Sequence, residues 1–150
     1  MNITKWIFFD DRSHFTETLT ATGQDKVKEG FAPLSEGFTF ALFNDAKSVE
    51  QAITPQTCAI MLEMVQGEGG VNCAEREFIK QVVVLCEQHG LLLIVDEIQT
   101  GVGRTGKLFA YEHYGIQPDI FTLAKGLGSG MPIGAMVGKE KLQRFTAWTW

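Results

Sequence analysis

The sequence predicts an α/β fold in which a mostly parallel β-sheet is flanked by helices. Two apolar runs, over residues 91–95 and 120–124, have the length of buried strands, and a polar residue follows each of them directly. Between residues 74 and 89, large apolar side chains recur at helical spacing and lead into the first of those runs. Strands that alternate with helices along a chain are typical of a parallel sheet with helices on its faces.

Five elements are expected up to Asp96. Asn44 or Asp45 can accept hydrogen bonds from the free amides at the start of the first helix. Gly90 can adopt the left-handed conformation that ends the second helix. In chain order the elements are a strand over 38–43, a helix from 44 or 45 to 53, a strand over 57–62, a helix over 74–89 and a strand over 91–95. A strand, a helix and a strand in succession predict a parallel pair joined by a right-handed crossover.

A glycine-rich loop follows Asp96. The later elements are a short aromatic helix over 108–114, a turn over 115–119, a strand over 120–124, a strand over 133–137 and a short helix from 139. No repeat, low-complexity tract or linker divides them, so one continuous α/β layer is expected. With 150 residues, the chain is long enough to bury a core.

The composition excludes several classes of function. The net charge of -5 is spread along the chain without a basic stripe, which argues against nucleic acid binding. The apolar run over 91–95 is far shorter than the ~18 residues of a membrane-spanning helix. Asp10 and Asp11 interrupt the first residues too early for a secretory signal. We therefore expect a cytoplasmic protein that binds neither membranes nor nucleic acid.

The cysteines and histidines show no spacing typical of metal ligands, and no metal site is predicted. An odd number of cysteines argues against a closed disulfide framework, so Cys58, Cys73 and Cys86 are expected to be plain buried thiols. His89 and His113 are expected on the surface near helix ends, where an imidazolium interacts favourably with the helix dipole.

Asp96 and Lys125 are the residues that suggest chemistry. Each directly follows an apolar run, and the ligands of an open α/β sheet collect at the carboxyl ends of its strands. Two parallel strands would therefore bring a carboxylate and an amine to one edge of the sheet. Taken singly, Lys125 also fits a solvated loop lysine, and Asp96 also fits a turn or helix-cap acid.

The segment over 91–135 resembles the signature of the class III (omega) aminotransferases, which have fold type I and use pyridoxal 5'-phosphate (PLP). The glutamate-containing turn over 60–71, the run over 57–59 and the tract over 109–115 are similar to motifs of the same family in the same order. Several motifs in family order are far more specific than one short pattern. The likeness is strongest to the members that act on N-acylornithine donors.

The resemblance implies a role for each matching residue. The family's lysine forms the Schiff base with PLP, and its aspartate keeps the ring nitrogen protonated, which assigns these roles to Lys125 and Asp96. Ile98 would pack on the ring face, and Gln99 would reach the ring hydroxyl. Glu68 would pair with an arginine and release it to bind the α-carboxylate of 2-oxoglutarate or glutamate. Because a Schiff-base lysine must be partly desolvated, Lys125 is expected to be partly buried at the end of its strand.

The implied activity is transfer of the terminal amino group of an N-acylornithine-like donor to 2-oxoglutarate, in a homodimer. Residues 1–150 would form part of the large, PLP-binding domain, and the N-terminal and C-terminal portions of the family would lie outside this chain. The phosphate-binding and substrate-binding arginine residues would lie in those portions. Phe9 is the candidate for an aromatic side chain that stacks on the ring.

Two alternatives remain open. The first is a noncatalytic remnant that keeps the scaffold without retaining the cofactor. The second is a nucleotide-binding protein. The loop over 101–107 satisfies G-x-G-x-x-G, and it matches the phosphate-binding pattern G-x-x-x-x-G-K-[ST] except at the last position. Leu108 stands where that loop needs a hydroxyl for magnesium, and the glycines do not directly follow a strand, so this reading is disfavoured.

Overall fold

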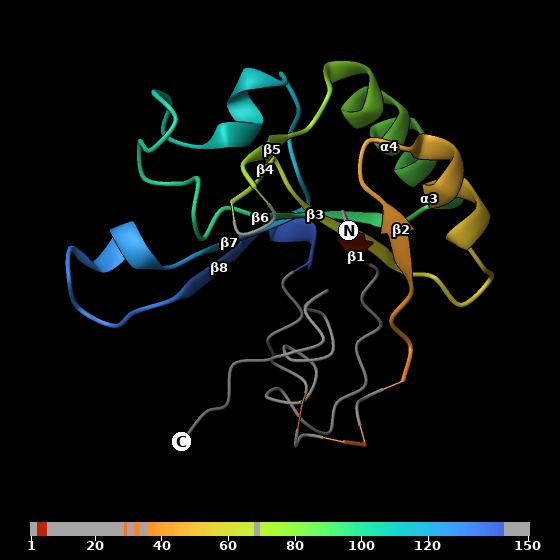
Figure 1. The fold of residues 1–150 in the computed structure, drawn as a ribbon, viewed down its shortest axis with the longest axis horizontal. Helices are drawn as coiled ribbons and strands as arrows, with labels where there is room; N and C mark the ends of the chain where they lie inside the picture. Colours follow the sequence, from red (N-terminus) through yellow and green to blue (C-terminus); the bar gives the residue numbers. More distant parts are fainter. Residues whose placement is uncertain (1–2, 6–28, 30–31, 34–35, 68–69, 143–150) are drawn as a thin grey trace.

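The fold is built on a six-stranded sheet (Figure 1). The structure is a computed structural model, and it describes residues 3–5, 29, 32–33, 36–67 and 70–142. The strands of the main sheet are β1 (Ile3–Lys5), β2 (Phe40–Leu42), β3 (Ala59–Glu63), β6 (Leu92–Asp96), β7 (Ile120–Leu123) and β8 (Ala135–Gly138). Their order across the sheet is β2-β1-β3-β6-β7-β8, and β4 (Val65–Gln66) and β5 (Asn72–Cys73) form a separate two-stranded sheet.

The central strands run parallel, as the sequence predicts. β6 pairs in parallel with both β3 and β7, whereas the pairs β1–β2, β1–β3 and β7–β8 are antiparallel. Because β2 is antiparallel to β1 and β1 is antiparallel to β3, strand β2 points in the same direction as the three central strands. The sheet is therefore mixed but mostly parallel in direction.

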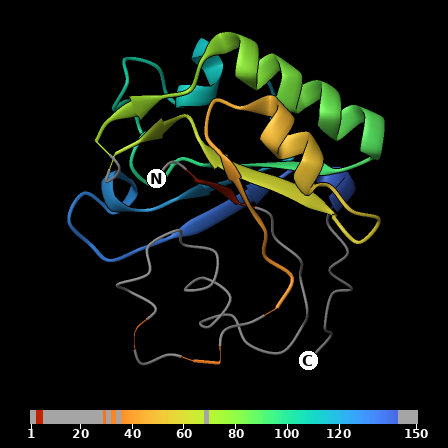
Figure 2. The ribbon, with the colours of Figure 1, turned by 45° about the vertical axis from the view of Figure 1, so that its right-hand side comes forward.

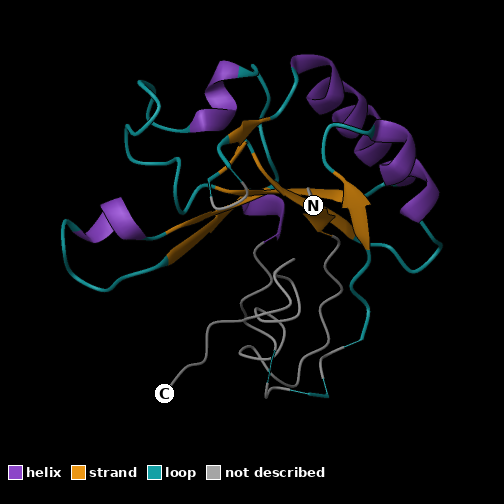
Figure 3. Cartoon of the chain, in the orientation of Figure 1, coloured by secondary structure: helices purple, strands orange, loops and turns teal. Residues whose placement is uncertain are grey.

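In the residues that the structure describes, two α-helices and three 3₁₀ turns accompany the strands, and Figure 3 shows helices and strands in separate colours. The helices are α3 (Ala46–Ala52) and α4 (Arg76–His89), and the 3₁₀ turns are η1 (Ala110–His113), η2 (Lys125–Gly128) and η3 (Glu140–Leu142). Asp45 caps α3 by accepting hydrogen bonds from the amides of Lys47 and Ser48. Gly90 ends α4 with a φ of 66°. Both caps confirm the predicted ends. The short helix expected over 108–114 is a shorter 3₁₀ turn, and the described start of the helix expected from 139 is the 3₁₀ turn η3.

The main core lies between the sheet and the helical layer. Figures 1 and 2 show α3 and α4 side by side on one face of the sheet. Alternate residues of β3 and β6 point toward these helices, and the buried side of α4 meets them. The fully buried members of this core include Val49, Ile60, Ile79, Val82 and Val95. Burial of these apolar side chains stabilises the sheet.

The other residues of the same strands line the opposite face. Ala59, Ile94 and Ile120 form a smaller buried cluster there, with Met61, Leu92 and Leu142 packed against it. Since side chains alternate along a strand, Asp96 continues the row of Leu92 and Ile94 on this second face. The residue that follows it, Glu97, points to the helical side.

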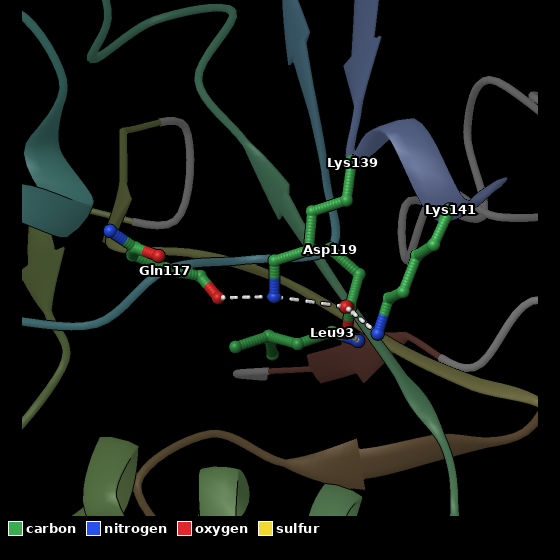
Figure 4. Close-up of polar contacts among 5 residues, drawn as sticks. All are labelled: Leu93, Gln117, Asp119, Lys139 and Lys141. Carbon is green, nitrogen blue, oxygen red and sulfur yellow. Dashed lines mark hydrogen bonds and ion pairs between the residues drawn. The ribbon is translucent and has the colours of Figure 1, made fainter. Parts of the chain in front are cut away.

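Asp119, at the amino end of β7, forms hydrogen bonds with Leu93 of β6 and with Lys139, which directly follows β8 (Figure 4). Its backbone N–H donates to the carbonyl of Leu93, and its side-chain Oδ2 accepts from the N–H of Leu93 at 3.1 Å. Its Oδ1 lies 3.0 Å from Lys139 Nζ and 3.2 Å from Lys141 Nζ. Burial acts to raise the pKa of Asp119, but these hydrogen bonds outweigh it and hold the pKa below its ordinary value.

Across the residues that the structure describes, no helix has the length and apolar character needed to cross a membrane.

Candidate active site

Asp96 ends β6 at the carboxyl edge of the sheet, where the parallel register places it beside Thr122 of β7 and Glu63 of β3. Its Oδ1 accepts hydrogen bonds from the N–H of Ile98 at 2.9 Å and from the hydroxyl of Thr122 at 3.3 Å. The first bond closes a turn of the kind that aspartate side chains form with the backbone two residues on. Within the described part of the chain, no hydrogen bond reaches Oδ2, so this half-buried carboxylate can still accept from a protonated ring nitrogen.

Thr122 is a site residue that the sequence analysis missed. It lies on the same sheet face as Asp96 because residues in register on adjacent parallel strands share a face. Its hydroxyl orients the Asp96 carboxylate from the neighbouring strand. The only sequence signal was a polar residue inside the otherwise apolar run Ile120-Phe121-Thr122-Leu123.

Lys125 follows β7 at the same edge of the sheet, so the strand ends are arranged as predicted. It opens the 3₁₀ turn η2 with a φ of 46°, a left-handed conformation that non-glycine residues rarely adopt. Such strain costs roughly 1–3 kcal/mol and clusters at functional sites. Gly126, next to it, lies against the loop after β6, since a β-carbon added to Gly126 would stand 3.6 Å from Val102 Cβ.

Lys125 was expected to be partly buried at the end of its strand, and within the described part of the chain this expectation is wrong. Lys125 is exposed, and so is every residue of β8. Figure 1 shows the reason: η2 lies in the connection between β7 and β8, which extends away from the helical layer. The end of the strand is adjacent to the core, but the turn that carries the lysine projects beyond it.

Ile98 and Gln99 form the turn directly after Asp96. Ile98 is half-buried and Gln99 is exposed. A β-carbon added to Gly67 would stand 3.2 Å from Gln99 Oε1, so the turn that precedes Glu68 lies against the Gln99 carboxamide. Glu68 itself lies outside the described residues, as does Phe9. The structure therefore brings the turn of Gly67 to the edge that holds Asp96 and Gln99.

Glu97 is buried on the helical side of the sheet, with 1% of its surface exposed. One carboxylate oxygen accepts from the hydroxyl of Thr100, and the other accepts from the N–H of Tyr111 at 2.9 Å. The two adjacent acids Asp96 and Glu97 therefore have separate environments, one open toward a ligand and one enclosed within the fold.

The glycine-rich loop over 101–107 does not have the geometry of a phosphate-binding loop. It leads into the four-residue 3₁₀ turn η1 instead of the α-helix whose N-terminus would hold a phosphate. The amine of Lys107 donates to the carbonyl of Glu112 at 3.1 Å. Gly101 lies in close contact with the end of β6, because a β-carbon there would stand 2.8 Å from the Glu97 carbonyl oxygen. This loop packs against the end of β6 and against η1, and the nucleotide-binding alternative has no support in it.

The cysteines and the described histidines differ in burial. Cys86 is buried in α4, and burial raises the pKa of its thiol to about 12. Cys58 is half-buried, but Cys73 is exposed, so the expectation of a buried thiol is wrong for Cys73 because the small β4–β5 sheet lies outside the main core. His89 is exposed at the end of α4 as expected, whereas His113 is half-buried and lies 3.0 Å from the carbonyl oxygen of Thr105. Among the described residues, no group of three or more His, Cys, Asp or Glu side chains could hold a metal ion.

Comparison with known proteins decides the family. The model of the family described as "Aminotransferase class-III" matches residues 9–149. The chain belongs to the class III aminotransferase family. This result confirms the family resemblance of the motifs over 57–135. Together with the matching solved structures it confirms the predicted fold class, a mostly parallel sheet flanked by helices, of fold type I.

Two relatives and one solved structure illustrate how similar the chain is to other class III aminotransferases. It is 57% identical over 122 residues to an acetylornithine aminotransferase of Caldanaerobacter subterraneus, covering 81% of this chain and 31% of the relative. It is 54% identical over 133 residues to a succinylornithine transaminase of Yersinia pseudotuberculosis, covering 89% of this chain and 32% of the relative. The chain therefore spans about a third of the length of the curated relatives it matches.

Among solved structures, the ornithine aminotransferase of Toxoplasma gondii matches with a TM-score of 0.73 and 40% sequence identity. The match covers 77% of this chain and 28% of that chain, and that structure is described as having partial occupancy of PLP at its active site. PLP is the cofactor of the class III aminotransferase family.

Proposed function

We propose that this chain carries the lysine and the ring-binding carboxylate of a PLP-dependent aminotransferase, and that residues 1–150 form part of its large domain. The observation that carries the proposal is the parallel pairing of β6 with β7, because it brings Asp96 and the residues leading to Lys125 to one edge of the sheet. The open Oδ2 of Asp96 suits a cationic ring nitrogen, so the residues present fit the cofactor.

When bound, PLP supplies an electron sink that stabilises the negative charge left after the substrate carbon loses its proton. Asp96 would hold the proton on the ring nitrogen, and the hydrogen bond from Thr122 would fix the orientation of its carboxylate. Ile98 would pack on the ring face, and Gln99 would bind the ring hydroxyl. The Lys125 amine would carry the cofactor and then move a proton at the substrate carbon as general base and acid.

The donor we propose is an N-acylornithine-like compound, and the acceptor is 2-oxoglutarate. The matches to relatives described as acetylornithine and succinylornithine enzymes support this substrate class. Glu68 would pair with an arginine outside the chain and so separate the donor and acceptor half-reactions. A homodimer and a cytoplasmic location complete the proposal.

Amino transfer assays on the full-length protein that contains these residues test the proposal. N-acetylornithine and 2-oxoglutarate are the substrates, and glutamate formation is the readout. We expect activity that depends on added PLP and is lost in Lys125→Ala. Lys107→Ala, which removes another exposed lysine in the loop after β6, should retain the activity. A protein that binds no PLP and forms no glutamate would favour the noncatalytic remnant. ATP binding that is lost in Lys107→Ala would favour the nucleotide-binding alternative.

A further inference from the structure

Glu97 has an unusual environment for a carboxylate. It is 1% exposed, and the buried polar side chains of the described residues are Glu97 and Thr100. In the described part of the chain, no Lys, Arg or His side chain forms an ion pair with it. Two neutral donors compensate only partly for the removal of a carboxylate from water, so the burial of Glu97 at this position costs stability.

The hydrogen bonds of Glu97 join four parts of the site. Its backbone N–H donates to the carbonyl of Thr122 in β7 at 3.0 Å, and its carbonyl accepts from the N–H of Gly101 at 2.8 Å. Its side chain accepts from the hydroxyl of Thr100 and from the N–H of Tyr111 in η1. One residue therefore connects the end of β6 with β7, with the glycine-rich loop and with η1.

These bonds enclose the turn formed by Ile98 and Gln99. Asp96 holds the start of this turn through the N–H of Ile98, and Glu97 holds its end through Thr100. The two acids act from opposite faces of the sheet because they are consecutive residues at the end of one strand. With both ends fixed, the backbone between them has little freedom to move Ile98 or Gln99.

We propose that Glu97 is a positioning residue, whose buried carboxylate fixes the Ile98–Gln99 turn in the conformation that places these side chains against the cofactor ring. This inference rests on the proposed function, because Ile98 and Gln99 contact PLP only if the site binds it. It assigns to Glu97 a role in the geometry of cofactor binding, separate from the roles of Asp96 and Lys125.

The test compares Glu97→Leu with Glu97→Gln in the full-length protein. Leucine removes both acceptors, whereas glutamine keeps a carbonyl oxygen for the N–H of Tyr111 and an amide for the hydroxyl of Thr100. The matched control is Glu112→Gln. Glu112 also accepts a backbone hydrogen bond, from Phe109 N–H at 3.1 Å, but this bond lies within η1 and its approach and does not involve the Ile98–Gln99 turn. The readouts are the PLP dissociation constant, the visible absorption band of bound PLP with its pH midpoint, and the melting temperature without PLP.

We expect Glu97→Leu to weaken PLP binding by about tenfold or more and to shift the absorption band, since small displacements of positioned groups have effects of this size. Glu97→Gln should restore most of the affinity and the wild-type band, and Glu112→Gln should match wild type. If Glu97→Leu does not fold, Thr100→Val, which removes only one of the two side-chain bonds, should shift the band and its pH midpoint in its place.

The inference is overturned if the Glu97 and Thr100 variants lower the melting temperature but bind PLP with wild-type affinity, band and pH midpoint. That result would make Glu97 purely structural while leaving the proposed function intact. A wild-type protein that binds no PLP would instead overturn both proposals, and the two failures are therefore distinguishable.

Discussion

Replacement of Asp119 by asparagine is expected to destabilise the fold by about 2–3 kcal/mol at neutral pH. The Asp119 side chain is 14% exposed and accepts hydrogen bonds from Leu93 N–H and from two lysines. A hydrogen bond to a charged acceptor contributes about 1.5–3 kcal/mol. The lysine side chains are 40% and 66% exposed, so solvent limits each ion pair to about 0.2–1 kcal/mol. Asparagine keeps one acceptor oxygen and therefore preserves only part of this total.

The effect of this substitution should depend on pH. The folded pKa of Asp119 lies below its ordinary value of 3.8, so its charge stabilises the fold fully above that pH. The stabilisation is lost as the pH falls through the lowered folded pKa. The difference in free energy of unfolding between wild type and Asp119→Asn should therefore stay constant from about pH 7 down to about pH 5 and shrink at about pH 3.

Urea denaturation followed by circular dichroism measures this difference. Glu77→Gln is the control, because the Glu77–Lys80 pair is 69% and 71% exposed and its loss should change the free energy of unfolding by less than about 0.5 kcal/mol. A destabilisation by Asp119→Asn that is no larger than that of the control, or that is the same at every pH, would show that the charge of Asp119 does not stabilise the fold in this way.

Three further substitutions and modifications test the core, the thiols and the loop. Ile60→Val, at a fully buried position, should cost about 0.5–1.5 kcal/mol in urea denaturation, whereas Val84→Ala, at a position 46% exposed, should cost clearly less. A thiol reagent should modify Cys73 in the folded protein and Cys86 only after denaturation. Burial shields the Cys86 thiol and raises its pKa to about 12, so it stays protonated. Rapid modification of both thiols in the folded protein would contradict this. Gly101→Ala should destabilise the protein by about 1–3 kcal/mol, because the added β-carbon would stand 2.8 Å from the Glu97 carbonyl oxygen and 2.8 Å from Leu123 Cδ2. An unchanged free energy of unfolding would show that the loop can shift.

The parts of the fold with a strong hydrophobic period were predictable from the sequence. The stripe of α4 and the apolar runs of β3, β6 and β7 each have a length and period that only one element type fits, and Asp45 and Gly90 mark helix ends. The antiparallel pairing of β1 and β8 was not predictable, because a strand has the same side-chain alternation in either direction.

The candidate site was predictable only in part, for a related reason. Asp96 and Lys125 stand out because each ends an apolar run, but the contact of Asp96 with Thr122 depends on the register between two strands. The burial of Glu97 depends on η1 folding over it, which no local pattern encodes. The exposure of Lys125 follows from the direction of η2, which is set by the β7–β8 connection.

We propose above all that the ends of β6 and β7 present an acid and an amine to one PLP molecule. Borohydride reduction of the PLP-loaded full-length protein, followed by peptide mapping, tests it most directly. We expect a reduced adduct on Lys125, and in Asp96→Asn a clearly weaker retention of PLP before reduction. An adduct on Lys107, Lys139 or Lys141 in place of Lys125, or undiminished retention in Asp96→Asn, would contradict it.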